Sequence, residues 1–126
     1  MKHIQKKGQT LVLLLIYVLV ALLITSAAVA IAITNSRGTD KVYQGVTAYD
    51  VAESGAETAM LKLLRDPSYT GETLTVNSGT ATITIMGTNI KTVTSRGTLG
   101  NFTRSIQATA DTSNNVLTVT SWKELN

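Results

Sequence analysis

The sequence predicts an α+β fold in which a long N-terminal helix, part transmembrane and part amphipathic, packs on a small antiparallel sheet of four to five strands. Three observations predict it. Residues 11–33 carry no charge, residues 40–65 repeat apolar side chains at helical spacing, and the chain from Glu72 onward alternates apolar residues with threonine. At 126 residues, one small domain beside a membrane segment is expected.

The uncharged segment has the length of a membrane span. Its 23 positions, Leu11 to Ile33, would form a helix of about 35 Å, enough to cross a hydrocarbon core of about 30 Å. Lys2, Lys6 and Lys7 precede it, which places the N-terminus in the cytoplasm by the positive-inside rule. We therefore expect a single-pass protein of the cytoplasmic membrane whose remaining chain faces outward.

The next segment is predicted to be an amphipathic helix that ends near Arg65. Asp66-Pro67 would stop it, because proline disfavours helical backbone at the residue before it. Gly38 leaves open whether residues 9–65 form one helix or are interrupted by a hinge or short break. The predicted apolar stripe comprises Val42, Val46, Tyr49, Ala52, Ala56, Ala59, Met60 and Leu63.

The C-terminal half is predicted to be an antiparallel meander, because the connections between its strands are short and rich in glycine and asparagine. Ala81, Ile83 and Ile85 should share one face, as should Phe102, Ile106, Ala108 and Ala110. The amphipathic helix offers the apolar surface that would cover that face. The expected strands are Thr73–Asn77, Thr80–Met86, Ile90–Ser95, Phe102–Ala110 and Val116–Trp122.

Composition argues against several function classes. The chain has no cysteine, and its one histidine is His3, so His-dependent or thiol catalysis and cysteine–zinc sites are not expected. Glu53 and Glu57 are one helical turn apart, and we interpret them as a polar strip and not as an acid–base pair. We therefore expect no enzyme activity, no catalytic residue, no metal and no cofactor. Removing the three lysines that precede Gly8 leaves eight basic and eight acidic residues, so no nucleic-acid binding is evident.

The junction Lys6-Lys7-Gly8-Gln9-Thr10-Leu11, followed at once by the apolar run, resembles the class III leader of type IV prepilins. The resemblance implies that a prepilin peptidase recognises Lys6, Lys7 and Gly8, cuts between Gly8 and Gln9, and methylates Gln9. It also implies four segments. These are a leader over 1–8, a transmembrane and filament-core helix over 9–36, an amphipathic helix over 37–66 and a β domain over 67–126.

A second segment, Ala48 to Met60 with Leu63-Leu64 after it, is similar to the alanine–glutamate helix of minor pilins and of the large tip pseudopilin of type II secretion systems. The two motifs together imply a structural subunit of a type IV pilus or secretion filament at the cell surface. Its partners would be other pilin subunits, the prepilin peptidase, an inner-membrane assembly platform and, before assembly, the lipid bilayer.

Two positions depart from that family. The fifth residue of the mature chain is usually a glutamate that pairs with the amino terminus of a neighbouring subunit, and here it is Leu13; the first is usually phenylalanine, and here it is Gln9. A buried amino group without a carboxylate partner is costly. The departures therefore favour a minor or tip subunit over the major one.

Other interpretations remain open. Leu11 to Ile24 followed by Ala28-Val29-Ala30 also fits a secretory signal with cleavage after Ala30, which would release a small β domain. An uncleaved signal anchor on a surface protein is the third possibility.

Overall fold

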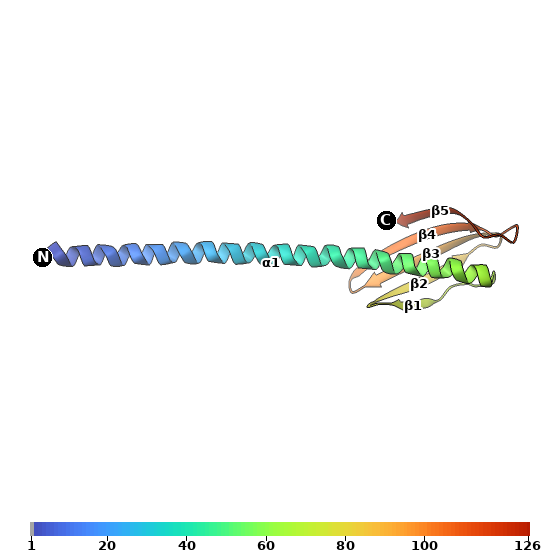
Figure 1. Ribbon diagram of the computed structural model, residues 1–126, viewed down its shortest axis with the longest axis horizontal. Coiled ribbons are helices and arrows are strands. Elements are labelled where there is room, and N and C mark those ends of the chain that lie inside the picture. The colour runs from blue at the N-terminus through green and yellow to red at the C-terminus, as the bar shows by residue number, and fades with distance from the viewer. Residues whose placement is uncertain (1) are drawn as a thin grey trace. The chain divides into compact units, whose positions relative to one another are not determined.

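The computed structural model describes residues 2–126, with side chains from Lys7 onward. It contains one long helix, α1 (Lys2–Arg65), followed by five strands (Figure 1). The strands are β1 (Thr73–Val76), β2 (Gly79–Met86), β3 (Ile90–Leu99), β4 (Phe102–Asp111) and β5 (Thr118–Leu125). The chain divides into two compact units, Met1–Asp40 and Lys41–Asn126. One long N-terminal helix and a five-stranded antiparallel sheet confirm the predicted α+β layout.

Helical structure continues through Gly38, which contradicts a break in the helix at this glycine. No proline lies between Lys2 and Arg65, and the backbone hydrogen-bond ladder can therefore run unbroken. The last turn carries Lys62 and Arg65, whose positive charges favour a helix C-terminus. Asp66 and Pro67 follow immediately, and the helix ends where the sequence predicts.

The five strands form an open antiparallel meander in the order β1-β2-β3-β4-β5. The predicted bounds are off by one residue in β1, β2 and β4 and by more in β3 and β5, where β5 spans Thr118–Leu125 in place of the predicted Val116–Trp122. β3 continues to Leu99 because the turn is made only by Gly100 and Asn101, with Gly100 at φ 57°. β5 begins at Thr118 and not at Val116, because Asn115 turns the backbone at φ 59° and Leu117 packs on the core before the strand starts.

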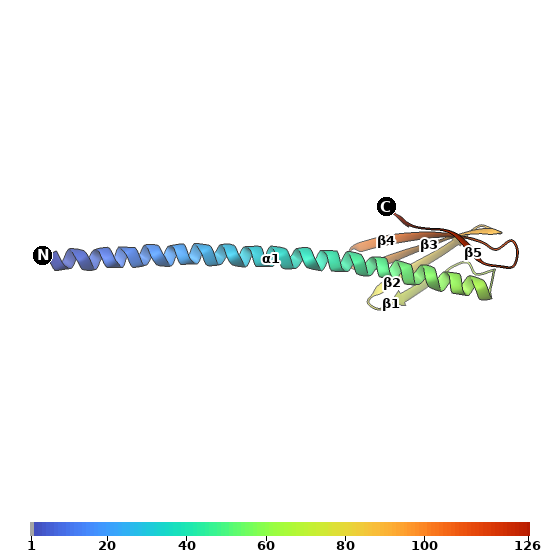
Figure 2. The same ribbon diagram turned by 45° about the horizontal axis from the view of Figure 1, so that its top comes forward.

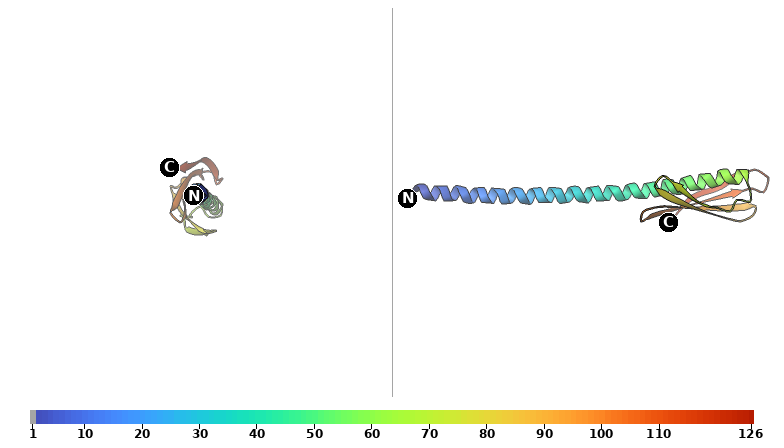
Figure 3. Two further views of the ribbon diagram at one scale, coloured as in Figure 1. Left: turned by 90° about the vertical axis from the view of Figure 1, so that its left-hand side faces the viewer. Right: turned by 90° about the horizontal axis from the view of Figure 1, so that it is seen from below.

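In the unit Lys41–Asn126, α1 covers one face of the sheet, forming two layers (Figures 2 and 3). The predicted inward-facing positions Ala81, Ile83, Ile106, Ala108 and Ala110 are confirmed as buried. Ile85, which packs against the core, and Phe102 are half-buried. The main core also takes Ala59, Met60 and Leu63 from α1 and Val93 from β3. The opposite face of the sheet is left uncovered by α1.

The helix face that packs on the sheet differs from the predicted stripe at its N-terminal end. Val42 and Val46 are 68% and 52% exposed, whereas Gly45 and Ala48 are buried. The buried face consists mainly of glycine and alanine, with Ala52, Gly55, Ala56 and Ala59 continuing it toward the C-terminus. Small side chains let the helix backbone approach the strands closely, and the large valines lie to the side.

Candidate processing and assembly site

The predicted processing site lies in the first turns of α1. Gly8 and Gln9 are both helical and exposed, as is Lys7 beside them. A β-carbon added at Gly8 would meet nothing within 4 Å, so this glycine is not required by packing within the chain. The prediction that the peptidase recognises Lys6 concerns a side chain that lies outside the described ones. Peptidase cleavage and methylation of Gln9 stay predictions.

The residues that follow form an exposed apolar surface. From Lys7 onward, α1 is long and apolar enough to cross a membrane, and its most apolar stretch is not buried within the chain. Leu11, Leu13, Tyr17 and Leu23 are each more than 65% exposed. An exposed apolar surface of this kind is compatible with a membrane span or a protein interface.

Hydroxyl groups within this segment make hydrogen bonds to the helix itself. Thr25 Oγ1 donates to the carbonyl of Ala21 at 2.7 Å, and Ser26 Oγ donates to Leu22 at 2.8 Å. Thr34 donates in the same way to Ala30 at 2.9 Å. Since a bilayer offers no water to a polar group, bonds of this kind make the segment compatible with lipid or with a dry helix interface.

Leu13 occupies the position at which the family pattern carries glutamate, and its side chain is 67% exposed. The first acidic residue after it is Asp40. The apolar half of the helix thus holds no carboxylate with which the amino terminus of a neighbouring subunit could pair.

Glu53 and Glu57, interpreted from the sequence as a polar strip, lie on the outer part of α1. Glu53 is half-buried and Glu57 is exposed. Neither forms an ion pair within the described chain. Over the same residues, no group of three potential metal ligands from His, Cys, Asp and Glu comes together.

A polar cluster that the sequence did not reveal ties the end of α1 to the loop before β1. Lys62 forms an ion pair with Glu72, and Tyr69 donates a hydrogen bond to the same carboxylate oxygen at 2.8 Å. The Lys62 ammonium also lies 5.4 Å from the Tyr69 ring centroid. Hydrogen bonds from Lys62 and Tyr69 hold the pKa of Glu72 below its ordinary value, while burial, aided by the bond to Glu72, raises the pKa of Tyr69 to about 12.

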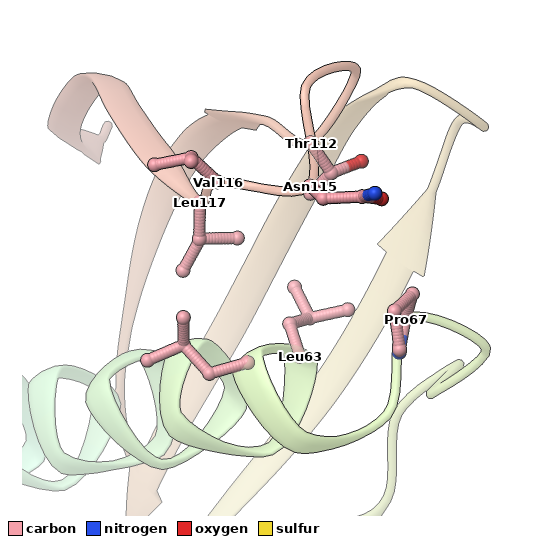
Figure 4. A pocket seen from close by; sticks show the side chains of 7 residues that line it. Leu63, Pro67, Thr112, Asn115, Val116 and Leu117 are labelled. Atoms are coloured by element: carbon pink, nitrogen blue, oxygen red, sulfur yellow. The ribbon is translucent and has the colours of Figure 1, made fainter.

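A cleft of about 260 Å³ lies between the last turn of α1 and the connection from β4 to β5. Figure 4 shows Leu117 extending from that connection toward the helix. No charged side chain lines the cleft, and the volume is below that of ordinary small-molecule sites. Its lining includes no His, Cys, Asp, Glu, Lys or Arg side chain. Its full lining is Leu63, Leu64, Pro67, Thr112, Asn115, Val116 and Leu117.

Neither a family model, nor a curated protein, nor a solved structure matches the chain.

Proposed function

We propose that the chain is a minor subunit of a type IV pilus or a type II secretion-like filament. In this proposal it is inserted by α1, cut between Gly8 and Gln9, and assembled through the apolar half of the helix. The observation that carries the proposal is the direct succession of a basic segment ending in glycine and an exposed, charge-free helix. Its role is mechanical, and no catalytic residue is assigned.

The exposed apolar surface of α1 suits a helix that moves from the lipid bilayer into a bundle of helices. The apolar side chains that face lipid before assembly would face neighbouring helices afterwards. Ala27, Ala28, Ala30 and Ala32 have small side chains that permit close helix approach in such a bundle. Hydroxyls such as Thr25 bring no unsatisfied donor into the interface, since they already bond within the helix.

The test is the substitution Gly8→Val in cells that contain a prepilin peptidase. A β-branched side chain should obstruct access of the backbone to the peptidase, and the full-length precursor should accumulate in the membrane. The measurement is the intact mass of the membrane-associated protein for wild type and variant. Gly38→Val, another helical glycine with nothing within 4 Å of an added β-carbon, is the matched control and should mature normally.

A secreted β domain is the second candidate, and one observation favours it. The boundary between the compact units falls at Asp40, so cleavage after Ala30 would leave the unit Lys41–Asn126 whole. Under that function Gly8→Val matures normally, and the mature chain begins at Ile31. An uncleaved anchor would give the full-length chain for both wild type and variant, the two masses differing only by the Gly-to-Val substitution.

A further inference from the structure

The sheet face that α1 leaves uncovered is rich in threonine and serine hydroxyl groups, with Met86, Ile90 and Leu125 at its margins. Residues that alternate with the buried ones point away from the helix, and cross-strand partners share a face. One row runs Thr75, Thr80, Thr98 and Thr103, each paired directly with the next across β1 to β4.

Two cations lie on this face. Arg96 on β3 pairs directly with Thr82 on β2 and Ser105 on β4. In the next row, Gln107 on β4 pairs with Thr94 on β3 and with Lys123 on β5. We call the set Thr82, Thr84, Thr94, Arg96, Ser105, Gln107 and Lys123 the donor face. Strand spacing places the Cα atoms of Arg96 and Lys123 on the order of 12 Å apart.

The donor face contains no carboxylate. Arg96 and Lys123 are exposed, and neither is in an ion pair among the described side chains. The acidic residue on the same side of the sheet is Asp111 at its end, where the carboxylate accepts hydrogen bonds from the Ser113 amide at 2.9 Å and from the Ser113 hydroxyl. The charge complement of the donor face is therefore an anion.

We propose that the donor face binds an acidic polysaccharide whose sugar rings carry carboxylates. Arg96 and Lys123 would each engage a carboxylate, and the surrounding hydroxyls, which both donate and accept, would bond to sugar hydroxyls. Duplex DNA fits less well, because it presents one charge per ~1.7 Å of its axis, whereas the donor face offers two cations on the order of 12 Å apart. The donor face also lacks an aromatic ring on which a base could stack. The site is independent of the proposed filament role.

The test uses the full chain in detergent micelles and immobilised polygalacturonate as the probe. We expect retention at low ionic strength that is lost near ~1 M salt, where the Debye length falls to about 3 Å. Neutral dextran should retain little. The double variant Arg96→Gln, Lys123→Gln should bind at least ~10-fold more weakly, since two charge-assisted contacts are lost, while Arg96→Lys should keep most of the binding.

The matched control is Lys41→Gln with Arg65→Gln, which removes two exposed cations from α1 and changes the net charge equally. This control should bind like wild type, and circular dichroism should show that both double variants are folded. The proposal is overturned if wild type is not retained, if dextran or a 20-base-pair DNA duplex binds as well as polygalacturonate, or if the control loses as much binding as the donor-face variant.

Discussion

Gly97 on β3 lies against the backbone of α1 at Ala52, so closely that a β-carbon added at Gly97 would stand 2.5 Å from the Ala52 nitrogen. The added β-carbon would also clash with the carbonyl oxygen of Ala48. Backbone meets backbone here, and neither side can move without displacing a whole element. This contact sets the distance between helix and sheet in the unit Lys41–Asn126.

Gly97→Ala should therefore destabilise the β domain by about 2 kcal/mol or more, because overpacking at a rigid contact forces backbone shifts. The measurement is urea unfolding of the full chain in detergent micelles, followed by the sheet signal. Gly45→Ala is the control: its added β-carbon would lie 3.9 Å from Phe102, an ordinary contact, and alanine favours the helix by up to about 1 kcal/mol. Equal effects at the two glycines would contradict the close approach at Gly97.

Ser95 carries a hydroxyl whose removal should not destabilise the fold, in contrast to the addition of a methyl group at Gly97. Its side chain is fully buried and its Oγ has no hydrogen-bond partner among the described residues. An unsatisfied buried hydroxyl costs roughly 1–3 kcal/mol, so Ser95→Ala should raise the free energy of unfolding by about 1 kcal/mol. Ser105→Ala, on the uncovered face, should change it by less than about 0.5 kcal/mol. Destabilisation by Ser95→Ala would mean that the hydroxyl does have a partner.

Stability should depend on pH in both the acidic and the alkaline range because of the cluster of Lys62, Tyr69 and Glu72. The pKa of Glu72 is lower in the folded state, so its contribution is present above its ordinary pKa and is lost as the pH falls through the folded value. The pKa of Tyr69 is raised from 10.0 to about 12, so its contribution is present below pH 10 and is lost as the pH rises toward 12. Urea midpoints between pH 3 and pH 7 should fall less steeply for Glu72→Gln than for wild type. Identical slopes would show that Glu72 is not the titrating group.

The sequence predicted the elements well because hydrophobic period and turn chemistry are local signals. Alternation placed Ala81, Ile83 and Ile106 on the correct face, and Asp66-Pro67 marked the end of α1. The helix face was harder to predict. A stripe of large apolar residues selected Val42 and Val46, but contact with the sheet depends on glycine and alanine, whose fit requires knowing the opposite backbone.

The candidate functional features likewise include some that the sequence predicts and some that only the fold reveals. The apolar helix and the junction at Gly8 are visible in the sequence, because charge and hydropathy are properties of single residues. The donor face is not, since it arises from register: Arg96 and Lys123 are distant in sequence and come onto one face only through the pairing of β3, β4 and β5. The cluster at Glu72 likewise depends on a loop returning to the last turn of the helix.

Leu13→Glu tests the minor role. A glutamate within a membrane helix costs roughly 2–4 kcal/mol on insertion scales when it has no partner, and pairing with the amino terminus of a neighbouring subunit would recover part of that. The variant should therefore be tolerated and should appear in sheared filaments at equal or higher stoichiometry than wild type. If wild type already forms the bulk of the filament, the minor role is wrong, and if the variant only loses insertion, the filament interface is not of the pilin kind.

The most direct test of the central claim is the intact mass of the wild-type mature protein together with its N-terminal residue, from cells that contain a prepilin peptidase. Cleavage between Gly8 and Gln9 predicts a chain of residues 9–126 that begins with an N-methylated Gln9. A mature chain that begins at Ile31, or an uncut chain that still carries Lys6 and Lys7, would contradict the filament-subunit account.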